Sequence, residues 1–231
     1  MPCLTTYRWY WSPTVALLWA VTLACAAPAN AGSVWQSATD FPAPREFAAA
    51  VVRDGRIYAV GGRPWQNGDD LDGAVDSIAP GETSWRAESP LDGMGPFVGQ
   101  VAAVDQLDRI IVFGGYNLAN DDRNDGMVYD PNEGPRGRIA ARAESAPDAN
   151  IAHARDGLGR LYAFGGGPGS SASVQRPNSA FAERYDASVD AWETLPPLPL
   201  PVANAAAVAD GAGGILVLGG LGAFAESRTR V

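Results

Sequence analysis

Four stretches of the sequence share one plan, an apolar run that ends in a pair of glycines: Arg56-Ile57-Tyr58-Ala59-Val60-Gly61-Gly62, Arg109-Ile110-Ile111-Val112-Phe113-Gly114-Gly115, Arg160-Leu161-Tyr162-Ala163-Phe164-Gly165-Gly166 and Gly214-Ile215-Leu216-Val217-Leu218-Gly219-Gly220. Successive glycine pairs are 53, 51 and 54 residues apart. A turn signal and another short apolar stretch precede each run. Two apolar runs joined by a tight turn predict a β-hairpin, so the chain carries four copies of one hairpin unit.

Two further strands are predicted after the glycine pairs. Tyr185-Asp186 stands seven residues before Trp192, and the second copy starts the same pattern at Tyr129-Asp130 but has Arg136 in place of the Trp. Short segments after Trp85 and Trp192 indicate outer strands. A unit of about 50 residues with four strands is typical of one blade of a β-propeller.

The order Gly-Gly, Tyr-Asp, Trp resembles the kelch repeat, and the resemblance covers residues 35 to 231. It implies an all-β fold, namely a kelch-type β-propeller of about four blades, each a four-stranded antiparallel sheet. An unrelated β-sandwich with recurring turns is the alternative.

The two ends of this region predict how the blades would close. Ser33-Val34-Trp35-Gln36 is typical of a fourth strand without a blade of its own, and Ala223-Phe224-Ala225-Glu226 echoes Ala180-Phe181-Ala182-Glu183, the start of a third strand. Pairing the two segments would close a small ring and remove exposed sheet edges. A fragment of a larger propeller is the alternative, because four blades is the lower limit of the architecture.

Residues 1–31 have the composition of an export signal. They carry one charge, Arg8, followed by an apolar run from Val15 to Cys25 and small residues up to Ala31. This order predicts a signal peptide cleaved after Ala31, and residues 32–231 then form the propeller domain of a secreted or periplasmic protein. A lipoprotein anchored at Cys25 is an alternative. The apolar run is shorter than the roughly 20 residues of a membrane span, so none is expected after cleavage.

Composition excludes two function classes. The chain has 17 basic and 26 acidic residues and a formal charge of −9, which argues against a nucleic-acid partner because such a partner requires a basic patch. The resemblance extends to galactose oxidase-like copper enzymes, which need a cysteine and two histidines. Cys3 and Cys25 both lie before the cleavage site and His153 is the one histidine of the chain, so copper oxidase activity is excluded and no cofactor is expected. A structural or channel-lining role is predicted for His153.

In a propeller blade, the loop that enters the first strand and the loop that follows the second strand emerge on the same face. Arginine and asparagine in these loops can hold a carboxylate or sugar hydroxyls. The candidate ligand-binding residues are Arg45, Arg63, Tyr116, Asn117, Asn150 and Asn204. The alternative is that they are ordinary turn residues.

Two acidic loops could offer oxygen ligands to Ca²⁺, through Asp70 and Asp72 in one and Asp122 and Asp125 in the other. Neither loop has the spacing of a calcium-binding loop or a glutamate at the bidentate position. Solvated turns rich in Asp and Asn are the commoner explanation, so no metal is expected.

The favoured function is an exported binding module that recognises a protein or a glycan through loops on one propeller face. It rests on the repeat and on the lack of a catalytic constellation. Two alternatives stay open. One is a sugar-acid mutarotase resembling N-acetylneuraminate epimerase, which would need an acid/base and an arginine for the carboxylate. The other is a structural segment of a larger envelope protein.

Overall fold

The computed structural model describes residues 38–64, 73–91, 98–116, 125–143, 149–167 and 177–222. These residues form strands, turns and connections, with no helix among them, which confirms the all-β expectation. All of them except Ala38 belong to one unit, Thr39–Val231. The predicted signal peptide, the predicted strand at Ser33–Gln36 and the segment that starts at Ala223 lie outside the described residues.

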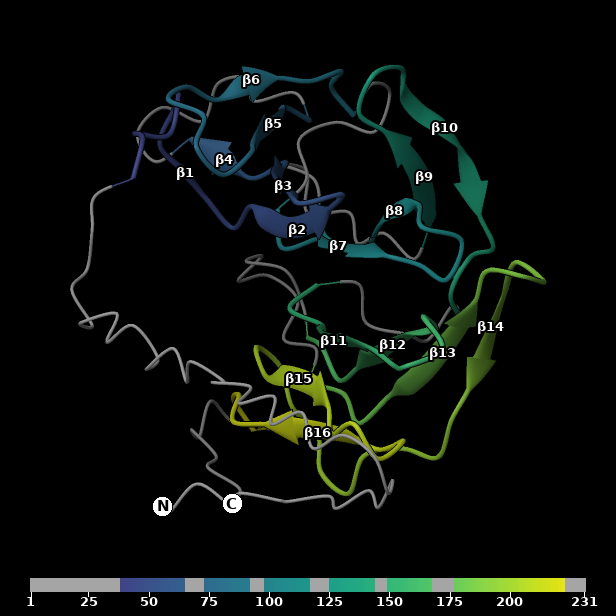
Figure 1. Cartoon of the computed structure of the whole chain (residues 1–231). Helices are drawn as coiled ribbons and strands as arrows, with labels where there is room; N and C mark the ends of the chain where they lie inside the picture. The colour runs from purple at the N-terminus through teal and green to yellow at the C-terminus, as the bar shows by residue number, and fades with distance from the viewer. Residues whose placement is uncertain are drawn as a thin grey trace, which may run out of the picture. The chain divides into compact units, whose positions relative to one another are not determined.

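Three four-stranded antiparallel sheets follow one another along the chain (Figure 1). We call them sheets I, II and III, and in each of them consecutive strands are neighbours. Sheet I contains β2 (Ala49–Arg53), β3 (Arg56–Val60), β5 (Val75–Ile78) and β6 (Arg86–Ala87). Sheet II contains β7 (Val101–Val104), β8 (Ile110–Phe113), β9 (Gly126–Asp130) and β10 (Gly134–Ile139). Sheet III contains β11 (Ala152–Arg155), β12 (Leu161–Phe164), β13 (Ala182–Asp186) and β14 (Ala191–Thr194).

Two smaller pairs complete the described strands. Hairpin IV consists of β15 (Ala206–Ala209) and β16 (Ile215–Leu218), and a short pair joins β1 (Arg45–Glu46) to β4 (Arg63–Pro64). The four predicted hairpins are therefore confirmed, each with its glycine pair directly after the second strand. The third and fourth strands are confirmed in sheets I, II and III, and in sheet II the fourth strand forms around Arg136 without a tryptophan.

Aspartate builds the turn inside three of the four hairpins. In the third hairpin, Asp156 Oδ1 accepts the backbone N–H groups of Leu158 and Arg160, both at 2.9 Å. Asp105 and Asp210 accept the N–H groups two and four residues onward in the same way. This is an Asx-type turn, in which the side chain satisfies backbone donors that the tight bend leaves over. Burial raises the pKa of Asp156, but the hydrogen bonds from Arg160 and the backbone outweigh it and hold the pKa below its usual value.

The glycine pairs end the second strands because a side chain would not fit there. A Cβ atom on Gly165 would lie 2.2 Å from the carbonyl oxygen of Val202, and Gly165 has a φ of +60°. Both facts favour glycine, which alone adopts this backbone without a steric cost.

Each sheet has two faces, and alternate residues of the second strand distinguish them. We call face A the one that carries Tyr58 and Val60 in sheet I, and face B the one that carries Ile57 and Ala59. The residue directly before the glycine pair and the residue two positions before that one lie on face A in every sheet. Face A therefore carries Ile111 and Phe113 in sheet II, and Leu216 and Leu218 in hairpin IV.

Successive sheets pack with face A of one against face B of the next. Tyr58 and Val60 of sheet I cluster with Ile110, Val112 and Tyr129 of sheet II. The same mode joins sheet II to sheet III, through Ile111, Phe113, Leu161, Ala163 and Tyr185. It also joins sheet III to hairpin IV, through Ala152, Phe164, Ile215 and Val217. The core therefore lies between the sheets, and sheets II and III are covered on both faces.

Three aromatic side chains in or next to the third and fourth strands also donate hydrogen bonds to backbone carbonyls. The indole N–H of Trp192 donates to the carbonyl of Ala140 at 3.0 Å, and that of Trp85 donates to the carbonyl of Thr39 at 3.4 Å. Tyr129 donates its hydroxyl to the carbonyl of Ser89 at 2.6 Å, and burial raises the pKa of this phenol. A buried indole or phenol needs such a partner for its polar end.

Candidate binding site at the strand starts

One residue in each repeat adopts a left-handed backbone two positions before the first strand. These residues are Phe47 (φ 58°), Gly99 (φ 71°), Asn150 (φ 58°) and Asn204 (φ 53°). Asparagine and glycine tolerate this conformation, whereas a phenylalanine adopts it only where surrounding structure imposes it. The recurrence shows that the approach to the first strand has the same shape in all four repeats.

Backbone hydrogen bonds link these residues from one repeat to the next. The N–H of Gly99 donates to the carbonyl of Phe47 at 3.3 Å, and the N–H of Asn204 donates to the carbonyl of Asn150 at 2.9 Å. The first strands of neighbouring sheets also approach one another, β2 to β7, β7 to β11 and β11 to β15. The strand starts of different sheets therefore lie beside one another.

The residue that follows each glycine pair lies next to a strand start. Glu46 pairs with Arg63, Val98 with Tyr116, Ala149 with Gly167 and Ala203 with Leu221. The loops before the first strand and after the second strand thus emerge at the same end of each sheet. We call the surface made by Glu46, Phe47, Arg63, Tyr116, Asn150 and Asn204 the strand-start surface.

Arg63 provides the positive charge of this surface in sheet I. Its Nε contacts the Glu46 carboxylate, and its guanidinium carbon lies 5.4 Å from the centre of the Phe47 ring. The side chains of Arg63 and Glu46 are 35% and 25% exposed, and Phe47 is 50% exposed. An arginine held by a carboxylate and an aromatic ring keeps a fixed direction while part of its fork stays accessible.

The other repeats contribute polar and aromatic side chains. Asn204 is exposed, so its amide can donate and accept hydrogen bonds at the surface, and Asn150 is half-buried. Tyr116 is 5% exposed and packs with Val98 and Ala149, which makes it a support for the surface and not an open contact residue.

The side chain of Arg45 contacts buried groups of sheet I and does not contribute to the strand-start surface. Its side chain is 3% exposed, forms an ion pair with Asp76 and donates to the carbonyls of Gly61 at 3.3 Å and Ala74 at 3.1 Å. These contacts point to a structural role, and Arg45 is not part of the site proposed below.

The ion pair of Arg45 has a counterpart in sheet III. There Arg142 donates to Glu183 at 2.8 Å, with both side chains 1% exposed. Asp76 pairs with Ala59 and Glu183 pairs with Ala163, which are equivalent positions of the third and second strands. A buried arginine therefore neutralises the acidic position of the third strand in two of the sheets.

His153 lies on β11, where it pairs with Ala163 of β12. Its side chain retains exposed surface, yet desolvation by the atoms packed around it lowers its pKa from 6.5. The imidazole is then neutral at pH 7 and can both donate and accept a hydrogen bond.

Several candidate residues lie outside the described residues, namely Asn117, Asp70, Asp72 and Asp122. Asp125 is described and forms an ion pair with Arg138. Within the described ranges, no group of three or more His, Cys, Asp or Glu side chains is arranged to hold a metal ion.

Sequence reasoning missed Glu46 and Phe47. The signal that identifies them is positional, since Phe47 precedes its first strand by the same two residues as Asn150 and Asn204. Residue type alone does not reveal it, because phenylalanine rarely adopts a positive φ.

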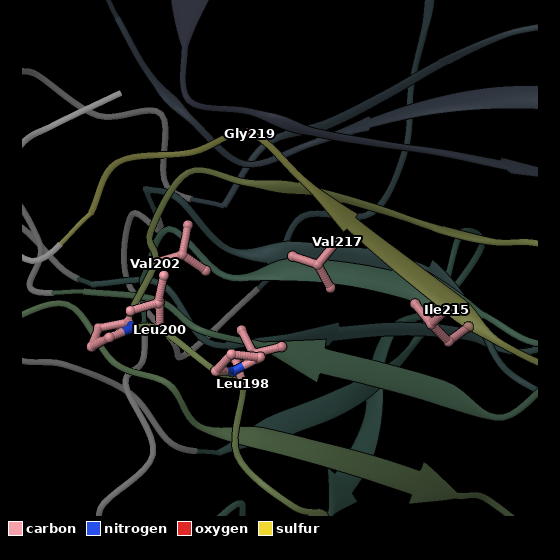
Figure 2. A pocket seen from close by; sticks show the side chains of 8 residues that line it. Leu198, Leu200, Val202, Ile215, Val217 and Gly219 are labelled. Atoms are coloured by element: carbon pink, nitrogen blue, oxygen red, sulfur yellow. The ribbon is translucent and has the colours of Figure 1, made fainter. Parts of the chain in front are cut away.

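An apolar pocket of about 220 Å³ lies beside hairpin IV and the segment that leads into it (Figure 2). It is lined by Leu198, Pro199, Leu200, Pro201, Val202, Ile215, Val217 and Gly219. Ile215 and Val217 correspond to Ile110 and Val112 of sheet II, where the third-strand residues Met127 and Tyr129 complete the cluster.

Comparison with known proteins assigns the chain to no family. No protein-family model matches the chain, and no curated protein matches its sequence. Among the described residues there is no helix with the length and apolarity needed to cross a membrane.

Proposed function

We propose that residues 32–231 form a kelch-type β-propeller that acts as an exported binding module, with its ligand held on the strand-start surface. Support for the propeller comes from the repeated packing of face A on face B and from the approach of the first strands to one another. Repeats that bury their faces only against neighbours are typical of this architecture.

The observation that carries the binding role is the joining of the strand starts. Backbone hydrogen bonds connect Gly99 to Phe47 and Asn204 to Asn150, so that strand starts of separate repeats lie next to each other. Loops placed by a rigid scaffold in this way are the usual location of binding residues.

The chemistry of the surface favours a glycan or protein segment that carries a carboxylate. Arg63 supplies a directed cation, the exposed Phe47 ring supplies an apolar contact, and the Asn204 amide can pair with hydroxyls or peptide groups.

A glycan array with neutral and carboxylated sugars tests this proposal. We expect binding that Arg63→Ala and Asn204→Ala each weaken at least tenfold. Arg136→Ala is the matched control, because Arg136 is 50% exposed on β10 and pairs with Glu133 away from the strand starts. Binding by the Arg63 and Asn204 variants equal to that of the original chain would place the ligand elsewhere.

A mutarotation assay on sialic acid, run beside the array, separates this function from the sugar-acid mutarotase. Binding without turnover supports the module. Turnover that is lost in the Arg63 variant would replace the module with an enzyme.

A further inference from the structure

The two ends of the stack of sheets expose apolar faces that the middle of the stack buries. Leu216 and Leu218 on face A of hairpin IV are 50% and 42% exposed, and Val208 beside them is 51% exposed. On face B of sheet I, Val52 and Ile57 are 61% and 40% exposed. By contrast, Ile111 and Phe113, which hold the positions of Leu216 and Leu218 in sheet II, are 0% and 2% exposed.

The exposed faces are of opposite kinds. Hairpin IV leaves Leu216 and Leu218 of its face A exposed, and sheet I leaves Val52 and Ile57 of its face B exposed. Asp76 lies on the same face of sheet I and is buried against Arg45. Face A on face B is the contact that joins sheet I to II, II to III and III to hairpin IV. The chain thus carries both halves of an interface that it already forms three times internally.

Within one copy these faces do not cover each other, since Leu216 and Ile57 are both exposed in the same chain. The other large exposed apolar residues of the turns, Leu107, Leu158 and Val189, stand singly. Isolated apolar residues on a surface are ordinary, whereas clustered ones mark a contact surface.

We infer that a second copy of this chain covers these faces, with face A of hairpin IV in each copy packed on face B of sheet I in the other. Two such contacts related by a two-fold axis close the pair and leave neither face exposed. The partner is a second copy because that copy supplies a face B for the exposed face A and a face A for the exposed face B, which is the same pairing that joins the chain's own sheets. This inference stands on the packing pattern and does not depend on the proposed function.

Two single substitutions and their mixture test the arrangement by light scattering on the purified full chain. Leu216→Arg blocks face A and Ile57→Arg blocks face B, and both positions are exposed, so the fold tolerates the change. We expect the original chain to have the mass of a dimer and each variant alone to have the mass of a monomer. An equimolar mixture of the two variants keeps one of the two contacts, because the intact face A of one variant meets the intact face B of the other, so part of the dimer should return at high protein concentration. Each variant alone keeps neither contact.

Val189→Arg is the control, since Val189 is 68% exposed in the turn at residues 187–190 and lies on neither face. It should leave the dimer intact. A monomeric original chain would overturn the inference, and so would an Ile57→Arg variant that remains dimeric alone, because face A would then pair with face A.

Discussion

At the scale of single residues, left-handed backbone positions decide where the repeats turn and where they meet. Phe47, Gly99, Asn150 and Asn204 share one conformation although their side chains have little in common. The shared feature is the path of the backbone, which brings an N–H of one repeat to a carbonyl of the previous one. The structure therefore repeats a shape at this point and leaves the side chain free to vary, as a binding surface requires.

Gly165→Ala tests the steric reading of the glycine pairs. The added Cβ would lie 2.2 Å from the carbonyl oxygen of Val202, on a residue with φ +60°. We expect the free energy of unfolding in urea to fall by about 2–4 kcal/mol, from backbone strain and overpacking together.

Gly157→Ala is the matched control, because a Cβ at Gly157 meets no atom within 4 Å. Its effect should stay within about 0.5 kcal/mol. Equal effects of the two substitutions would show that the second-strand glycines are not selected by close packing.

At the scale of elements, the fourth strand of sheet III is tied to the connection that leaves sheet II. Asp190 Oδ1 accepts the backbone N–H of Ala140 at 2.9 Å and the hydroxyl of Tyr185 at 2.7 Å. The indole of Trp192 completes the link through the carbonyl of Ala140. A turn residue and a strand residue thus bind the backbone N–H and the backbone carbonyl of the same residue, Ala140.

Asp190 makes this tie dependent on pH. The backbone N–H of Ala140 and the Tyr185 hydroxyl lower the pKa of Asp190 below its ordinary value of 3.8. Because the folded pKa is the lower one, the stabilisation is present above the unfolded pKa and is lost as the pH falls through the folded pKa. We expect the melting temperature of the original chain to fall more between pH 6 and pH 3 than that of Asp190→Asn.

Asparagine suits the comparison because Asp190 has φ 47°, which asparagine tolerates, and its amide oxygen still accepts a hydrogen bond. Parallel melting curves for the two proteins over this pH range would contradict the tie.

The sequence anticipates the features that depend on neighbouring residues. The apolar runs and the glycine pairs predict the hairpins, and Tyr185-Asp186 with Trp192 predicts the outer strands, because alternation and turn chemistry act locally. The burial of Arg45 was not predictable in this way. Its partner Asp76 is 31 positions away, and the contact exists only once the third strand has returned beside the second.

The candidate site divides along the same line. Arg63, Asn150 and Asn204 are placed at the strand starts as expected, since their loops follow from the hairpin order. Glu46 and Phe47 join them through a backbone conformation that their residue types do not signal. Tyr116 is expected at the same end, yet packing against Val98 and Ala149 turns it inward.

At the scale of the whole molecule, equivalent residues have different surroundings according to the sheet that carries them. Ile111 and Leu216 hold the same position of the second strand, but the next sheet covers one and leaves the other exposed. Their energetic roles in a single copy should differ accordingly.

Ile111→Ala and Leu216→Ala measure that difference. We expect Ile111→Ala to reduce the free energy of unfolding by about 2–5 kcal/mol, because it opens a cavity between two sheets. At low protein concentration Leu216→Ala should cost about 0.5 kcal/mol or less, since its side chain is half in water. Urea titrations compare the two variants directly, and equal losses would mean that hairpin IV is covered within one copy.

The uneven covering of the sheets also sets an order of local opening. Sheets II and III have neighbours on both faces, so their amide protons exchange with solvent only when a neighbour separates first. Hairpin IV, like sheet I, packs on one neighbouring sheet, but it has two described strands where sheet I has four, so it opens by losing fewer contacts. Unfolding of the described part of the chain therefore begins with the separation of β15 and β16. The strands between Val101 and Phe164 unfold last, and their amide protons keep their protection against exchange for the longest time.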